Sequence, residues 1–251
     1  MVRRRPRPGA KALAICLAAL LPAAAMAQTA CRQALAIGLD VSGSVDRIEY
    51  RLQLVGLANA LMQPDVRQAL LAMPSAPVRL LIFEWSGARD QHILLPWTEI
   101  TTDADLTAIN AVLQRKARLA TAHTTAIGAA IEMGAAHLAT QTSCWKHTLD
   151  LTGDGKSNAG PRPRDAALPA GADITVNALV IGTVSDPLAG DREGELAELV
   201  AYFQSEVIRG VDAFTETATG FRDFEQAMVR KLLKELQGMS VSRTAPRKAP
   251  G

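Results

Sequence analysis

The chain has 251 residues, 48% of them hydrophobic and 21% charged, a composition typical of a globular protein with one sizeable core. Its formal net charge of +2 depends on five basic residues near the amino terminus: Arg3, Arg4, Arg5, Arg7 and Lys11. Removing these five residues takes away no acidic residue and leaves a charge of −3. The excess of basic residues is therefore no sign of nucleic-acid binding.

Residues 1–27 have the pattern of a secretory signal peptide. The basic start is followed by an apolar run over residues 12–25, and the small residues at 25 and 27 fit a cleavage site. The apolar run is shorter than the roughly 20 residues that span a membrane, and no second long apolar run follows. We therefore expect a periplasmic or secreted protein without an integral membrane anchor.

The mature chain would keep two cysteines, Cys31 and Cys144. In an exported chain two cysteines favour a single disulfide, because the compartment is oxidising. Two buried free thiols are the alternative.

Buried strands alternate with amphipathic helices along the rest of the chain. Apolar runs predict strands at residues 33–39, 78–85, 91–97, 146–151, 174–181 and 211–214. Periodic apolar positions predict helices at residues 46–62, 103–119, 126–140, 193–207 and 220–236. The residues expected to face the sheet in the first helix are Ile48, Leu52, Val55, Ala58 and Met62.

This alternation predicts a doubly wound α/β fold with helices on both faces of a mostly parallel sheet. The second and third strands are joined by a turn at residues 86–90, so the third strand is expected to be antiparallel at the edge, where Pro96 is tolerated. Neither a repeat nor a linker divides the chain. We expect one domain over residues 28–238 and a disordered basic tail over residues 239–251.

Three turns in this pattern carry oxygen-bearing side chains. Asp40, Ser42 and Ser44 follow the first strand, Thr125 precedes a helix rich in Ala and Gly, and Asp154 follows the strand at 146–151. Doubly wound folds place ligands outside the carboxyl ends of their strands, so the three turns can meet there. Carboxylates and hydroxyls suit Mg²⁺, Mn²⁺ or Ca²⁺. Each turn alone is also typical of an ordinary turn or helix cap.

Together the three turns resemble the metal-ion-dependent adhesion site (MIDAS) of von Willebrand factor type A (vWA) domains. The sequence is most similar to an exported bacterial vWA-like family called domain of unknown function 1194. The segments that carry this resemblance are residues 40–46, 84–86, 125–128, 153–155 and 231–235. The resemblance extends in element order from about residue 34 to residue 236.

The resemblance implies a vWA fold with strand order 3-2-1-4-5-6. It also implies a bound Mg²⁺, or else Mn²⁺ or Ca²⁺, whose ligand set is Asp40, Ser42, Ser44, Thr125 and Asp154. Thr124 is the less favoured alternative to Thr125, because Thr125 aligns with the Ala-Ile-Gly that follows it. If the two aspartates meet at one end of adjacent parallel strands, the two cysteines should meet at the other end.

Such a site implies a protein-binding module, in which an Asp or Glu of a partner takes the open coordination position. A metal-assisted hydrolase and a purely structural metal clamp are the alternatives. We expect no enzyme, because no catalytic base or nucleophile is identifiable. His123 is the histidine nearest to a motif, and Ser42 does not lie in a G-x-S-x-G elbow.

Overall fold

The computed structural model describes residues 30–119, 122–182 and 192–237. The predicted signal peptide, the basic tail and a loop expected at residues 186–191 lie outside these ranges. In the described part of the chain, no helix combines the length and the apolar character needed to cross a bilayer. The strands and helices, in chain order, are β1 (Gln33–Asp40), α1 (Arg47–Met62), α2 (Pro64–Leu71), β2 (Val78–Trp85), β3 (Gln91–Ile100), α3 (Asp103–Arg115), α4 (Ile127–Ala139), β4 (His147–Gly153), β5 (Ile174–Ile181), α5 (Arg192–Glu206), β6 (Thr215–Ala218) and α6 (Phe224–Gln237).

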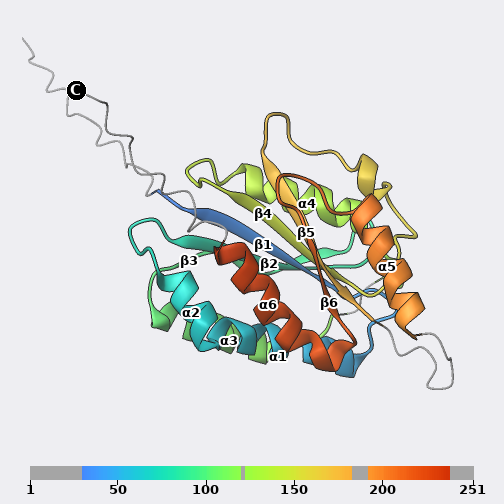
Figure 1. The fold of residues 1–251 in the computed structure, drawn as a ribbon, viewed down its shortest axis with the longest axis horizontal. Coiled ribbons are helices and arrows are strands. Elements are labelled where there is room, and N and C mark those ends of the chain that lie inside the picture. The colour runs from blue at the N-terminus through green and yellow to red at the C-terminus, as the bar shows by residue number, and fades with distance from the viewer. Residues whose placement is uncertain (1–29, 120–121, 183–191, 238–251) are drawn as a thin grey trace, which may run out of the picture.

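The strands form one six-stranded sheet in the order β3-β2-β1-β4-β5-β6 (Figure 1). All neighbouring strands are parallel except β2 and β3, which pair antiparallel at the edge. The strand order and the antiparallel edge strand confirm the prediction. Helices α1, α2, α3 and α6 cover one face of the sheet, and α4 and α5 cover the other.

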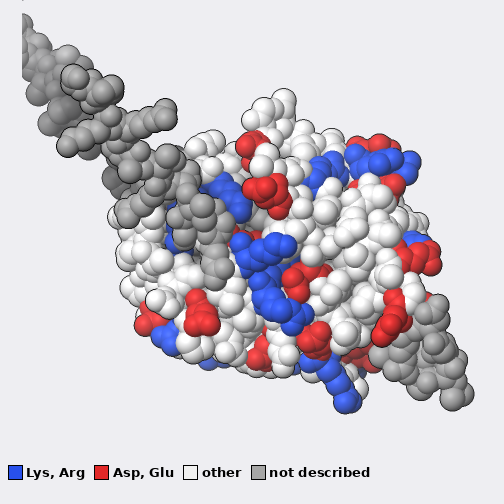
Figure 2. Space-filling model, viewed as in Figure 1, with Lys and Arg blue, Asp and Glu red and all other residues white. Residues whose placement is uncertain are grey.

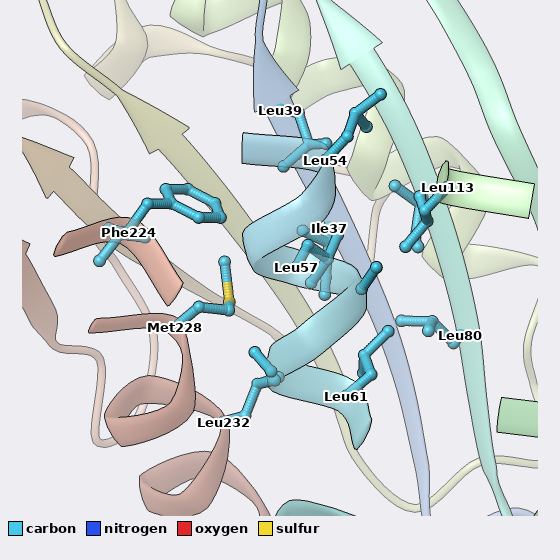
Figure 3. Packing of buried hydrophobic residues seen from close by; sticks show 14 of the residues in the cluster. Ile37, Leu39, Leu54, Leu57, Leu61, Leu80, Leu113, Phe224, Met228 and Leu232 are labelled. Atoms are coloured by element: carbon cyan, nitrogen blue, oxygen red, sulfur yellow. The ribbon is translucent and has the colours of Figure 1, made fainter. Parts of the chain in front are cut away.

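Helix α1 packs across the middle of the sheet and against α6. It begins after a capping box: the Asp46 carboxylate accepts the backbone N–H groups of Ile48 and Glu49, and Glu49 accepts the N–H of Asp46. Figure 3 shows the apolar contact of α1 with the strands and with α6, which is formed by Leu54, Leu57, Leu61, Ile37, Leu39, Leu80, Phe224, Met228 and Leu232. This packing fixes α1 beside the carboxyl end of β1.

The predicted inward face of α1 is only partly correct: Ala58 is buried, but Leu52, Val55 and Met62 are half-buried and Ile48 points to solvent. Ile48 is 71% exposed, whereas Tyr50 is buried and donates its hydroxyl to the Glu84 carboxylate at 2.6 Å. Apolar residues recur on two sides of this helix, so periodicity alone allowed either side to face inward. The helix is oriented by the side that carries Tyr50, Leu54 and Leu57.

The end of the chain also departs from the expected boundaries. The last strand is β6, at 215–218 rather than 211–214, because Gly210 and Asp212 have φ angles of 98° and 56° that interrupt an extended chain. A 3-10 turn at Phe221–Asp223 precedes α6, which therefore begins at Phe224 rather than at Gly220. Helix α3 ends at Arg115, four residues before the predicted end, because the next residue is extended.

A buried ion cluster joins α6 to the sheet. The Lys231 ammonium lies 2.6 Å from a carboxylate oxygen of Asp150 on β4 and 2.6 Å from one of Glu235 on α6. Asn177 on β5 donates to the same Glu235 oxygen at 2.7 Å. Burial, with the charge of Glu235 second, raises the pKa of the Asp150 carboxyl well above its ordinary value. The cluster thus connects α6 to both β4 and β5 through buried polar side chains.

The predicted disulfide between Cys31 and Cys144 is present. The two Cα atoms are 4.2 Å apart, and the backbone N–H of Trp145 donates to the Cys31 carbonyl at 2.8 Å. The bridge therefore ties the amino ends of β1 and β4 together, opposite the ends that carry Asp40 and Asp154.

Replacing both cysteines by serine should lower the free energy of unfolding by about 4–5 kcal/mol. The bridge joins residues 113 apart in sequence, so its loss restores a large loop-closure entropy to the unfolded chain. Urea unfolding of the oxidised protein, the reduced protein and the double variant measures this. The reduced protein and the variant should agree with each other, and an unchanged midpoint in both would contradict the prediction.

Candidate metal centre

The carboxyl ends of β1 and β4 place two aspartates at one edge of the sheet. Asp40 is the last residue of β1 and is fully buried, and Asp154, which directly follows β4, is 6% exposed. Gly153, at the end of β4, leaves room for the Phe203 ring of α5: a Cβ there would lie 2.8 Å from that ring, whereas its 3.7 Å separation from Oδ2 of Asp40 would be an ordinary contact. This arrangement agrees with the expectation that the turns after the two strands meet at the carboxyl ends of β1 and β4.

The loop after β1 connects the two aspartates through hydrogen bonds of Ser42 and Ser44. Oδ1 of Asp40 accepts the backbone N–H of Ser42 at 2.8 Å. The hydroxyls of Ser42 and Ser44 are 3.2 Å apart, and Ser44 donates to Oδ1 of Asp154 at 2.7 Å. Four of the five predicted site residues therefore lie in one continuous hydrogen-bonded arrangement.

Thr125, the fifth predicted residue, is held against the loop that follows Asp154 by its backbone, and these hydrogen bonds do not involve its hydroxyl or the other four residues. Its backbone N–H donates to the Asn158 side chain at 2.8 Å, and its carbonyl accepts the Asn158 backbone N–H at 2.8 Å. Thr125 is buried whereas Thr124 is exposed, which favours Thr125 as the residue directed into the molecule. The turn before α4 and the turn after β4 are thus held side by side.

Both carboxylates present a second oxygen that has no partner. Oδ2 of Asp40 and Oδ2 of Asp154 are buried and accept no hydrogen bond from the described residues. Burial, and then the charge of Asp154, raises the pKa of Asp40 to about 7. Burial also raises the pKa of Asp154, against the opposing effect of the Ser44 hydrogen bond. Two facing carboxylates in a desolvated place are what a divalent cation would neutralise.

The donor set is rich in hydroxyls. In residues 30–119, 122–182 and 192–237 no group of three or more His, Cys, Asp and Glu side chains could hold a metal ion. The residues that converge here instead offer two carboxylates and three hydroxyls, all hard oxygen donors of the kind preferred by Mg²⁺ and Mn²⁺. These residues therefore suit such an ion chemically, and the two carboxylates would balance its two positive charges.

Sequence reasoning missed Arg118, which fixes the loop after β1 from outside. Its guanidinium donates to the carbonyls of Val41 and Ser42 at 3.2 and 3.3 Å and also to the carbonyl of Val45. More than 70 residues separate Arg118 from these carbonyls, and no sequence pattern linked them. His123 contacts the same loop through its backbone carbonyl, which accepts the Gly43 N–H at 3.2 Å.

The sequence matches one protein family over most of its length. The model of a family described as protein of unknown function (DUF1194) matches residues 30–240. The chain belongs to the DUF1194 family. No curated protein matches the sequence of this DUF1194 chain. The predicted resemblance to that family is confirmed.

Solved structures similar to the DUF1194 chain have vWA folds. The open conformation of the pilus adhesin SpaC from Lactobacillus rhamnosus GG has 14% identity and a TM-score of 0.56, over 84% of this chain and 31% of the adhesin chain. Proximal thread matrix protein 1 of the mussel byssus, with a zinc-occupied MIDAS motif, has 13% identity and a TM-score of 0.52, over 83% of this chain and 46% of that chain. The DUF1194 chain therefore spans about a third to a half of these proteins, and the likeness shows the vWA-like fold.

Proposed function

We propose that this protein is an exported, divalent-metal-dependent protein-binding module of the adhesion type. The observation that carries the proposal is the pair of buried, unpartnered carboxylate oxygens on Asp40 and Asp154. A bound Mg²⁺ or Mn²⁺ would supply a positive centre with an open coordination position. The vWA-like fold, which this chain shares with a pilus adhesin and a thread matrix protein, supports the choice of a binding role.

Each of the five residues has a distinct role in this proposal. The hydroxyls of Ser42, Ser44 and Thr125 would ligate the ion. Asp40 and Asp154 would neutralise its charge, and Ser44 would remain hydrogen-bonded to Asp154, as it is here at 2.7 Å. The position left open would accept a carboxylate from an Asp or Glu of the protein partner, because a hard cation prefers a charged oxygen ligand.

The surroundings of the site favour binding over hydrolysis. A metal-assisted hydrolase needs a base beside the ion. His123 contacts the loop at Gly43, through its backbone carbonyl and through its exposed imidazole, whose Nδ1 would lie 2.9 Å from a Cβ at Gly43; both contacts are with Gly43 rather than with Asp40 or Asp154. On the face shown in Figure 2, basic and acidic side chains are interspersed, which suits a protein partner better than nucleic acid.

The test is capture of a partner on the immobilised mature protein from a periplasmic extract of the source cells. We expect a protein that binds with Mg²⁺, is released by chelator and does not bind to Asp40→Ala. Asp65→Ala, which removes an exposed carboxylate on α2, should bind it as the wild type does. A partner retained equally in chelator and on Asp40→Ala would contradict the proposal.

A further inference from the structure

The hydrogen-bond ladder between β1 and β4 stops short of the metal site. Its last backbone pair is Gly38 with Leu151, although β1 continues to pair with β2 as far as Asp40 with Trp85. The N–H of Asp40 donates instead to the hydroxyl of Thr152, at 3.0 Å. A side chain thus takes the place of the backbone acceptor that the ladder would have used.

Gln53 of α1 closes this contact into a triangle. The Thr152 hydroxyl donates to Oε1 of Gln53 at 3.0 Å, and Nε2 of Gln53 donates to the carbonyl of Asp40 at 2.9 Å. Gln53 and Thr152 are each 1% exposed. An amide buried on the face of α1 that packs against the core is costly unless it is hydrogen-bonded, so this side chain is fixed in one orientation.

The triangle immobilises the residue at the centre of the metal site. Both backbone polar groups of Asp40 are engaged by side chains from two different elements, α1 and β4. Its carboxylate is held further by the Ser42 N–H on one oxygen, which leaves Oδ2 as the oxygen without a partner. The main chain of Asp40 can therefore shift towards an ion only if the triangle breaks, and a fixed main chain limits how far the carboxylate can move.

We propose that Gln53 and Thr152 set the ion selectivity of the site by holding Asp40 in place. This inference rests on the proposed metal binding. Mg²⁺ requires near-ideal octahedral geometry with oxygens at about 2.0–2.1 Å, whereas Ca²⁺ accepts irregular geometry with oxygens at about 2.3–2.6 Å. A rigid carboxylate favours Mg²⁺ or Mn²⁺, and a carboxylate that can move admits Ca²⁺. Gln53 and Thr152 are positioning residues in this scheme.

The decisive quantity is the ratio of the Kd for Ca²⁺ to the Kd for Mg²⁺, measured by calorimetric titration. Thr152→Val keeps the shape of the side chain but removes the hydroxyl. We expect it to weaken Mg²⁺ binding by about tenfold or more and to lower the ratio, because changes to residues that orient a ligand cost about that much in metal affinity. Thr152→Ser should restore the wild-type ratio, and Gln53→Leu should reproduce the effect of Thr152→Val.

The chain offers a matched control in Thr148, which is also buried on β4. Its hydroxyl accepts a hydrogen bond from Gln33 at 2.9 Å, at the amino end of the sheet and away from the metal site. Thr148→Val should lower the melting temperature as Thr152→Val does while leaving the Kd ratio unchanged. An unchanged ratio in both Thr152→Val and Gln53→Leu would overturn the inference and leave the metal site standing. A wild-type protein that binds none of these ions would overturn both.

Discussion

Replacing Asp40 by asparagine should abolish Mg²⁺ binding and at the same time stabilise the metal-free protein at pH 8. The two effects have one cause. The carboxylate of Asp40 is fully buried, faces Asp154 and keeps one oxygen unpartnered, so its negative charge is unfavourable in the fold unless a cation is present. Asparagine removes that charge and with it the attraction for the ion.

The pH dependence follows from the raised pKa of Asp40. Because the pKa is about 7 in the fold and about 3.8 in the unfolded chain, the folded state holds a proton that the unfolded state has lost between these values. The metal-free protein therefore loses stability as pH rises from about 4 to 7. The full effect is of the order of 4 kcal/mol. Added Mg²⁺ should accordingly raise the melting temperature more at pH 8 than at pH 5.5.

Thermal unfolding at both pH values, with Mg²⁺ and with chelator, measures these effects in the wild type and in Asp40→Asn. Asp65→Asn, on the exposed start of α2, is the control and should follow the wild type. Equal Mg²⁺ affinity in the wild type and Asp40→Asn, measured by calorimetry, would rule out the site. A metal-free Asp40→Asn protein that is less stable than the wild type at pH 8 would rule out the electrostatic account.

Replacing Lys231 by methionine should lower the free energy of unfolding by about 3–5 kcal/mol. The ammonium is fully buried and lies between the carboxyl groups of Asp150 and Glu235, which are themselves almost completely buried. Removing the cation leaves two acids in the core with no positive partner, which costs far more than the loss of an exposed ion pair. Urea unfolding with a fitted slope measures the change.

Two variants separate this effect from a general weakening of α6. Lys234→Met removes an exposed ammonium that lies 3.9 Å from the centre of the Phe214 ring, and it should cost about 1 kcal/mol or less. Asp150→Asn should also be mild, because the raised pKa of Asp150 already favours its neutral form. If Lys231→Met cost no more than Lys234→Met, the buried cluster would not contribute as we expect.

The features predicted correctly from the sequence are those that depend on local residue patterns or on the resemblance to a family. Strands β2 and β5 have the predicted bounds because continuous apolar runs are flanked by turn residues. The strand order came from the vWA resemblance, and the disulfide followed from two cysteines placed at similar distances before two strand ends. The convergence of the serines with both aspartates required only that β1 and β4 be neighbours.

What the sequence left undetermined depends on contacts between distant segments. Ile48 was assigned to the core because α1 is apolar on two sides, and only the sheet beneath the helix distinguishes them. From the sequence, Arg118 cannot be distinguished from an ordinary surface arginine, because its three backbone acceptors lie more than 70 residues away. Gln53 gives no signal either, because a polar residue in an apolar helix is equally compatible with a solvent-facing position.

The bridge between Cys31 and Cys144 has a consequence for the order of events in the cell. The central strand β1 finds its partner β4 only after more than a hundred further residues have been synthesised, and the cysteines cannot meet before then. Such long-range pairing is slow to form. If the chain is exported as we propose, it can remain extended in the reducing cytoplasm and pass through a translocation channel. Disulfide formation after export then stabilises the folded state against unfolding, so the protein reaches its full stability only in the oxidising compartment.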